Sequence, residues 1–245
     1  PERTHSSLHD VKCCRTIEPR GRRGGKRLHG WGRRAPGHAH WHNARSMLLN
    51  RVETALMNNP LRGFVQRHYE ARKLQRLGGR ALGQHVLEVG CGRGVGVEIL
   101  IDEFGANRVD AFDLDPRMVD LARRRLAARG DRVKLWQGSV TDIRAADASY
   151  DAVFDFGIIH HVPAWRDALA EIFRVLRPGG RFFAEEVLAK FIAHPLWRRL
   201  LDHPQLDRFD RGSFARALAG VGFEVRVSEE LWGDLAWFVA DKPER

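Results

Sequence analysis

The sequence predicts an α/β protein with a seven-stranded, mostly parallel sheet, helices on both faces of the sheet and an antiparallel last strand. From residue 84 onward, short apolar runs rich in β-branched and aromatic residues alternate with stretches in which apolar residues recur every three or four positions. Clusters of glycine and proline separate the two kinds of stretch. Such alternation favours a parallel sheet, because each crossover between parallel strands usually takes a helix.

The individual elements follow from these patterns. Asp115-Pro116 marks a helix start, because aspartate caps a helix and proline suits its first turn. Arg177-Pro178-Gly179-Gly180 ends a helix and turns the chain into a strand. We expect strands at residues 85–89, 108–112, 133–137, 151–156, 181–187, 223–228 and 235–240. We expect helices near residues 95–104, 116–129, 164–176 and 213–220.

A helical region precedes the sheet. Apolar side chains recur at helical spacing between residues 48 and 77. Asn58-Asn59-Pro60 divides this region into two helices, and Gly78-Gly79 ends the second one. We therefore expect residues 47–83 to form an N-terminal helical cap on a domain that spans residues 84–245.

Residues 1–46 differ in composition from the rest of the chain. They carry 11 of the 41 Lys and Arg residues, six of the 12 His residues and few apolar side chains. Such a stretch buries too little apolar surface to offset the entropy lost on ordering, so we expect it to be disordered. Three alternatives stay open for this segment. In the first, the natural protein starts at Met47. In the second, the segment is a basic arm that contacts nucleic acid or an anionic membrane, and in the third, His38, His40 and His42 bind a metal.

Charge and composition exclude several classes of protein. The net charge of +10 comes mostly from residues 1–46, since the remaining residues hold 30 basic and 28 acidic side chains. A nucleic-acid-binding domain carries its basic residues on a folded face, so we expect no nucleic-acid partner. No run approaches the ~20 apolar residues that cross a bilayer, so we expect no membrane span. Three cysteines and no secretory signal indicate a cytoplasmic protein, and we predict no resident metal. The sequence does not indicate the oligomeric state.

The strongest local signal is a glycine-rich turn after the first strand, in the string Val86-Leu87-Glu88-Val89-Gly90-Cys91-Gly92-Arg93-Gly94. Glycine lets a ligand approach the backbone closely. The spacing does not match the dinucleotide-binding pattern, and the Lys-Ser/Thr pair of a phosphate-binding P-loop is absent. A carboxylate at Glu88 is a poor neighbour for a pyrophosphate. It suits a cofactor that carries a positive charge, such as an ammonium or a sulfonium.

Asp113 closes the second strand. An acid at this distance from the glycines can accept hydrogen bonds from both hydroxyls of a ribose. Without a ligand its side chain would lie in solvent, while Asp115 would cap the following helix. The other interpretation makes Asp113 a turn residue, and we favour the ribose role.

These motifs, taken together, resemble the class I S-adenosylmethionine-dependent methyltransferases over roughly residues 62–241. The resemblance implies a Rossmann-like fold, S-adenosyl-L-methionine as cofactor and a small-molecule methyl acceptor, in a branch that includes quinone methyltransferases. Besides the acid-and-glycine loop and Asp113, it rests on these strings: Gly138-Ser139-Val140-Thr141-Asp142, Tyr150-Asp151-Ala152-Val153-Phe154-Asp155-Phe156-Gly157, Ile159-His160-His161-Val162 and Arg174-Val175-Leu176-Arg177-Pro178-Gly179-Gly180.

The resemblance also implies where each motif residue meets the cofactor. Glu88 would face the amino group. The loop under the methionine part would consist of Gly90, Cys91, Gly92 and Gly94.

The ribose and adenine would meet the next two motifs. Asp113 would bind the ribose hydroxyls, with Leu114 against the adenine. Asp142 would accept a hydrogen bond from the adenine amino group, beside the backbone of Val140. The wall next to the sulfonium would consist of Asp155, Phe156 and Gly157.

Two adjacent histidines are the candidate catalytic residues. Methyl transfer from a sulfonium is an in-line displacement, so the protein mainly positions the reactants. A base is needed only where the nucleophile must lose a proton. His160 and His161 follow the fourth strand at the edge of the sheet where ligands bind, and histidine titrates near neutral pH. The other interpretation is that one histidine is structural and the other points to solvent. We expect an apolar or aromatic acceptor, bound by the N-terminal helices and by the segment that contains Phe191, His194, Trp197, Leu200, Leu201, His203, Phe209 and Phe214. The other interpretation, which we favour for most of these residues, is that they form helix faces packed on the sheet.

Three other functions are possible. A nicotinamide-dependent oxidoreductase conflicts with the glycine spacing and with Glu88. A nucleic-acid-associated methyltransferase, recruited by the basic arm, would carry an Asn/Asp-Pro-Pro-Tyr/Phe motif at the end of the fourth strand, and this sequence has none there. A cofactor-binding homologue without catalysis stays open, because the family has no universal catalytic residue.

Overall fold

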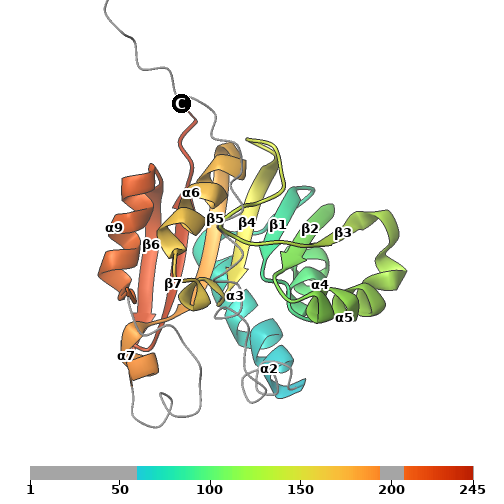
Figure 1. Cartoon of the computed structure of the whole chain (residues 1–245), viewed down its shortest axis with the longest axis horizontal. Coiled ribbons are helices and arrows are strands. Elements are labelled where there is room, and N and C mark those ends of the chain that lie inside the picture. Colours follow the sequence, from blue (N-terminus) through green and yellow to red (C-terminus); the bar gives the residue numbers. More distant parts are fainter. Residues whose placement is uncertain (1–59, 194–206, 245) are drawn as a thin grey trace, which may run out of the picture. The chain divides into compact units, whose positions relative to one another are not determined.

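The computed structural model describes residues 60–193 and 207–244, and it contains a seven-stranded sheet in the order β3-β2-β1-β4-β5-β7-β6 (Figure 1). Strands β1 to β5 run parallel to one another. The last strand, β7, is antiparallel to both of its neighbours, as predicted. The strands are β1 (His85–Val89), β2 (Arg108–Asp113), β3 (Val133–Gln137), β4 (Tyr150–Phe156), β5 (Leu176–Val187), β6 (Glu224–Leu231) and β7 (Leu235–Asp241).

The main difference from the predicted strands is the start of β5. Leu176 already pairs with Tyr150, and the register then shifts before Arg181 pairs with Ala152. Glycine is needed at position 180, because a Cβ there would lie 2.8 Å from the carbonyl oxygen of Arg177. We expected Pro178-Gly179-Gly180 to form a turn before the strand. In the structure these residues instead form an irregularity inside β5.

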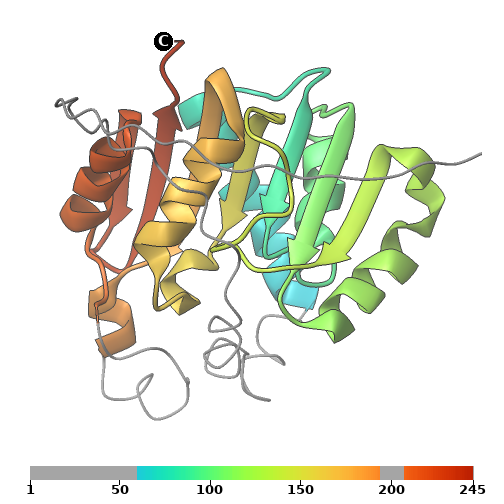
Figure 2. The same ribbon diagram turned by 45° about the horizontal axis from the view of Figure 1, so that its top comes forward.

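The helices cover both faces of the sheet. The buried side chains of α3, α4 and α5 share one core cluster, and those of α6 and α9 share the other. Figure 2 shows α6 and α9 beside each other on their face. The helices are α2 (Pro60–Val65), η2 (Gln66–Glu70), α3 (Ala71–Gly78), α4 (Val95–Asp102), α5 (Pro116–Leu126), η3 (Ala127–Arg132), η4 (Ile159–His161), α6 (Trp165–Val175), α7 (Ala189–Ala193) and α9 (Arg211–Val221).

Helix ends follow the local chemistry of the sequence. Asp115 caps α5 by accepting a hydrogen bond from the backbone N–H of Arg117, and Pro116 opens the helix as predicted. Asp210 and Ser213 form a reciprocal capping box at the start of α9. The N-terminal helical run ends at Gly78, and Gly79 has a φ of 84°. The expected disorder of residues 1–46 and the first expected helix, up to residue 59, lie outside the described residues.

Aromatic side chains pack among the aliphatic core residues on both faces of the sheet, as the near-continuous apolar strands require. On one face Phe154 and Phe183 stack with ring centroids 4.4 Å apart, and Phe104 packs edge-on against Phe154. On the other face Trp165 stacks on Phe214. Phe209 and Phe214, which we had placed in a segment around the acceptor, are buried at 3% and 0% exposure and belong to this core.

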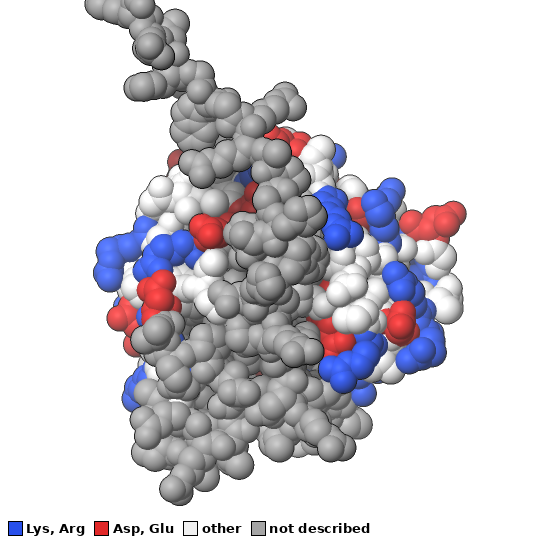
Figure 3. Space-filling view, in the orientation of Figure 1, with Lys and Arg blue, Asp and Glu red and all other residues white. Residues whose placement is uncertain are grey.

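The surface of the described residues mixes both signs of charge. On the face in Figure 3, Lys and Arg side chains alternate with Asp and Glu side chains. Arg125 and Arg129 of the α5 region pair with Glu98 and Asp102 of α4 at 2.9 and 2.7 Å. This matches the near-neutral charge balance of the chain after residue 46.

The strand order creates one point where neighbouring connections diverge. The chain leaves β1 toward β2 on one side, and β4 lies on the other side of β1. In open α/β sheets, ligands bind outside the carboxyl ends of the strands at such a point. The loops that follow β1, β2, β3 and β4 therefore frame the expected site.

The packing of α3 on the sheet gives a test of the fold. A Cβ on Gly78 would lie 2.3 Å from Cε1 of the buried Phe183 ring. We expect Gly78→Ala to lower the free energy of unfolding by about 1–3 kcal/mol, because the core is already filled. Gly220→Ala is the matched control. Gly220 is exposed in α9 and nothing lies within 4 Å of an added Cβ, so this change should raise stability by about 0.4–1 kcal/mol. Urea unfolding of both variants measures this, and equal effects would contradict the α3 packing.

Candidate functional site

The glycine loop after β1 takes a backbone conformation that favours glycine. Gly90, Gly92 and Gly94 all have positive φ angles, of 70°, 50° and 84°. A Cβ on Gly90 would meet Ile158 at 2.6 Å, and one on Gly94 would meet Leu126 at 2.8 Å. Nothing lies within 4 Å of a Cβ on Gly92. The first and third glycines therefore permit close packing, and the middle one leaves an open face on the loop.

Asp113 ties this loop to the turn after β2. Its Oδ2 accepts a hydrogen bond of 2.9 Å from the backbone N–H of Gly92, and its Oδ1 accepts one of 2.9 Å from the N–H of Asp115. The expectation that this side chain lies in solvent without a ligand is therefore wrong. Burial raises the pKa of Asp113, and the two N–H donors oppose that rise. Each carboxylate oxygen has a second acceptor position, so the group can still take hydrogen bonds from a ligand.

A cavity of about 110 Å³ opens beside this pair of loops. Five residues that the sequence placed around the cofactor line it together, and His161 joins them. These are Gly90, Asp113, Leu114, Val140, Gly157 and His161. Five more lining residues were not singled out, namely Phe112, Gly138, Ser139, Ile158 and Val162. These five residues lie next to the predicted ones in the sequence. Their position in the loops at the carboxyl ends of the strands is the signal that could have identified them.

Glu88 is the buried acid of the first motif. It is 2% exposed, and its Oε2 has no hydrogen-bond partner among the described residues. Burial raises the pKa of Glu88, and the charges of Asp113 and Asp155 raise it further. A Cβ on Gly96 would lie 2.0 Å from Oε1, so the carboxyl group rests against the first turn of α4. An orphaned buried carboxyl oxygen beside an open glycine loop fits a positively charged ligand group.

Other predicted residues lie away from the cavity lining. Cys91 is 4% exposed, and burial raises the pKa of its thiol. Asp142 is exposed in the turn that it closes with Ser139. Phe156 is 5% exposed and packs in the core with Phe154. Neighbouring residues of a strand point to opposite faces, so Asp155 and Phe156 do not share one wall.

A buried pair of acids holds the turn that carries the histidines. Glu186, at the end of β5, accepts hydrogen bonds from the N–H groups of Ile159 and His160 at 2.7 and 3.2 Å. The Nδ1 of His160 lies 2.6 Å from Oε2 of the same carboxyl group. Asp155 accepts from the N–H of Ile158 at 2.9 Å, and both acids are fully buried. Burial raises the pKa of Glu186 to about 7 and raises that of Asp155, which Glu186 raises further.

Sequence reasoning missed Glu186 and its neighbour Glu185. The signal was present, because two acids in succession end an otherwise apolar strand. Glu185 points to the opposite face, where Trp237 donates a hydrogen bond to it at 2.9 Å and Arg62 lies 3.9 Å away. Arg62 of α2 also pairs with Glu70. These contacts join the N-terminal helices to the carboxyl end of β5.

Comparisons with known proteins show which proteins the chain is similar to. The methyltransferase-domain family matches residues 86–180. The chain is 38% identical over 124 residues to a probable S-adenosylmethionine-dependent methyltransferase of Mycolicibacterium smegmatis, covering 49% of this chain and 46% of the relative. It is 34% identical over 148 residues to the ubiquinone/menaquinone biosynthesis C-methyltransferase of Paracoccus denitrificans, covering 59% and 58%. The chain thus spans about half the length of these relatives.

A solved structure shows the same fold. The S-adenosylmethionine-dependent methyltransferase of Aquifex aeolicus superposes with a TM-score of 0.62 at 19% identity, over 77% of this chain and 96% of that one. In the part of the chain that the structure describes, no helix is long and apolar enough to cross a membrane.

The buried acid at position 186 predicts a pH dependence of stability. The pKa of Glu186 is about 7 in the folded protein against a reference of 4.5, so the folded state holds this proton more tightly than the unfolded chain. The resulting stabilisation is complete below about pH 4.5 and is lost as the pH rises through about 7. A shift of this size corresponds to roughly 3 kcal/mol. We expect Glu186→Gln to flatten the decline in unfolding free energy between pH 5 and pH 8.

The control for this measurement is Asp120→Asn, at an exposed acid on α5. This variant should keep the wild-type slope of stability against pH. An unchanged slope in Glu186→Gln would show that the Glu186 carboxyl group is not the one that titrates over this range.

Proposed function

We propose that the chain transfers a methyl group from S-adenosylmethionine to a small, apolar or aromatic acceptor, because residues 86–180 match the methyltransferase-domain family. The observation that carries the proposal is the joint placement of the glycine loop, the orphaned Glu88 carboxyl oxygen and Asp113 at one edge of the sheet. Two carboxyl groups that accept hydrogen bonds, placed in this way, fit a ligand that carries both a positively charged group and a ribose.

The proposed binding mode assigns the cofactor to the cavity of about 110 Å³ and the loop beside it. Glu88 would face the positively charged amino group of the cofactor, beside the open face of Gly92. Asp113 would hold the ribose hydroxyls while it keeps Gly92 and the start of α5 in place. Leu114 and Val140 supply apolar walls for the adenine. The bound cofactor supplies an activated methyl group on a sulfonium.

The protein's own share of the chemistry is positioning, exclusion of water and proton transfer. We propose His160 as the base for acceptors that must lose a proton. Support comes from Glu186, which holds Nδ1 of the ring at 2.6 Å and so favours the tautomer in which Nε2 carries a lone pair. His161, in contrast, lines the cofactor cavity. A cytoplasmic location stays a prediction from the three cysteines.

The name of one relative supports a small-molecule acceptor. One matched relative is a quinone-biosynthesis methyltransferase by name, and its acceptor class agrees with the small-molecule branch that the motifs resemble. The described part of the chain presents mixed charge on the face of Figure 3, which offers no support for a nucleic-acid substrate.

Calorimetry tests the cofactor assignment. We expect S-adenosylmethionine and S-adenosylhomocysteine to bind the full chain, because both carry the amino group and the ribose that Glu88 and Asp113 would recognise. NAD should not bind, because its pyrophosphate would face the Glu88 carboxyl group. Tight binding of NAD together with no heat from S-adenosylmethionine would overturn the proposed function.

A pair of aspartate variants tests the ribose contact. Asp113→Asn keeps one accepting oxygen for the loop but replaces the other by a donor, so it should weaken S-adenosylhomocysteine binding by at least ~10-fold. Asp115→Asn is the matched control, because asparagine also caps helices and the pair with the exposed Arg117 contributes little. Its affinity should stay within about twofold of the wild type. The reverse pattern would assign the ribose to Asp115.

A further inference from the structure

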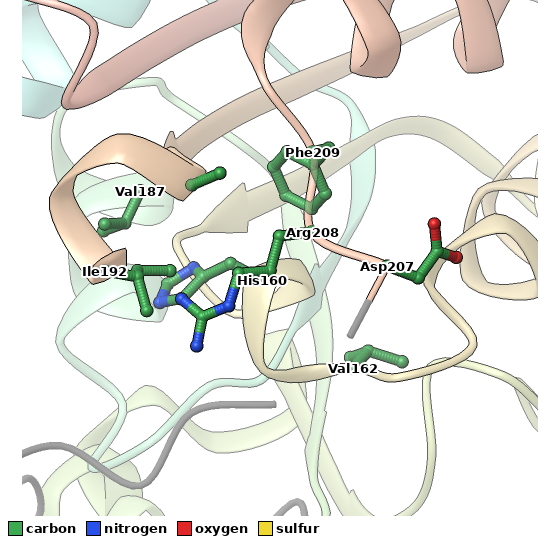
Figure 4. A pocket seen from close by; sticks show the side chains of 8 residues that line it. His160, Val162, Val187, Ile192, Asp207, Arg208 and Phe209 are labelled. Atoms are coloured by element: carbon green, nitrogen blue, oxygen red, sulfur yellow. The ribbon is translucent and has the colours of Figure 1, made fainter. Parts of the chain in front are cut away.

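A second, smaller cavity adjoins the first. It is lined by the polar side chains of His160, Asp207 and Arg208 and by apolar residues, among them Val162, Val187, Ile192 and Phe209 (Figure 4). Val162 also lines the cavity assigned to the cofactor, so the two spaces share a wall. The smaller cavity measures about 10 Å³, which is room for about one water molecule. Its size suits a single polar atom of a ligand rather than a ligand's whole body.

The backbone on both sides of Arg208 is fixed by specific contacts. The indole N–H of Trp165 donates to the carbonyl oxygen of Asp207 at 2.8 Å, and the carboxylate of Asp207 pairs with Arg166. The N–H of Ala189 donates to the carbonyl oxygen of Phe209 at 3.1 Å. The Phe209 ring lies against Trp165. Arg208 is therefore placed by its neighbours at this cavity.

Asp207 directly precedes Arg208 and also lines the cavity. Its φ is 54°, in the left-handed region, which aspartate adopts more readily than most residues other than glycine.

Charged groups of both signs surround the cavity. Burial lowers the pKa of Arg208, but a guanidinium keeps its charge at neutral pH. The carboxylate of Asp207 pairs with Arg166, and the His160 ring contacts the buried Glu186. A partly buried guanidinium beside apolar side chains binds an oxyanion more strongly than one in full solvent.

We propose that this cavity binds the acidic oxygen of the methyl acceptor, a carboxylate or phenolate oxygen, against the guanidinium of Arg208. The inference rests on the proposed function and narrows it to methylation at an acidic oxygen. A carboxylate oxygen attacks the methyl carbon directly. A phenol first gives its proton to the His160 imidazole. In both cases the new O–C bond forms as the C–S bond breaks, the electron pair stays on sulfur, and neutral S-adenosylhomocysteine leaves.

Binding measurements test the anion subsite without turnover. The full chain, saturated with S-adenosylhomocysteine, is titrated with benzoate and benzamide, and separately with 4-nitrophenolate and nitrobenzene. We expect at least one anion to bind ~10-fold or more tightly than its neutral partner. Arg208→Gln should abolish that preference and leave S-adenosylhomocysteine affinity unchanged, while Arg208→Lys should keep part of it. Arg211→Gln, at an exposed arginine on α9, is the matched control and should behave as wild type.

The outcomes separate the two proposals. If S-adenosylhomocysteine itself does not bind, the proposed function fails. If it binds but anions and neutral partners bind equally, or neither binds, or the preference survives in Arg208→Gln, the acidic-oxygen subsite is overturned and the methyltransferase proposal stands.

Transfer assays with labelled S-adenosylmethionine then distinguish the two oxygen sources. His160→Gln should reduce methylation of a phenol at least ~10-fold, because the phenol must lose a proton. It should leave methylation of benzoate within about twofold, because a carboxylate needs no base. Equal losses on both acceptors would overturn the role of His160 as base and would make the ring a positioning group for the turn.

Discussion

The carboxylate of Asp113 is the interaction on which the candidate site depends. It joins the middle of the glycine loop to the start of α5, so two loops that follow different strands keep one relative position. The loop conformation relies on positive φ angles at its three glycines, and Cys91 is its one buried side chain. Its hold on the rest of the molecule comes from this side chain, from backbone contacts, from Asp113 and from the N-terminus of α4. One side chain both shapes the binding surface and belongs to it.

Acids at the carboxyl edge of the sheet give this region its electrostatic character. Glu88, Asp155, Glu185 and Glu186 are all buried, and burial raises the pKa of each. Placing four carboxyl groups out of water lowers the stability of the apo protein at neutral pH. Clusters of perturbed acids are typical of functional sites, because the same burial that costs stability strengthens their interaction with a ligand or a neighbouring histidine.

The fold and the cofactor edge could be predicted because their signals are local. β1 and β3 lie at their predicted bounds, since turn residues stand at their ends and apolar residues fill them. Glu186 and Arg208 were missed because their roles depend on contacts between distant segments. Glu186 meets His160 across 26 positions, through the pairing of β4 with β5. Arg208 is placed by Trp165, whose indole N–H reaches residue 207 across 42 positions. Side chains alternate along β4, so Asp155 and Phe156 point to opposite faces, and their place in the cofactor wall stays a prediction.

Val162 belongs to the linings of both cavities. Its side chain lines both cavities, so a ligand in either one touches the same isopropyl group. Two ligands that contact the same residue are coupled only where they favour different or matching states of that residue, and any such coupling is reciprocal. If both ligands favour one rotamer of Val162, binding in one cavity strengthens binding in the other. If they favour different rotamers, each weakens the other by the same factor.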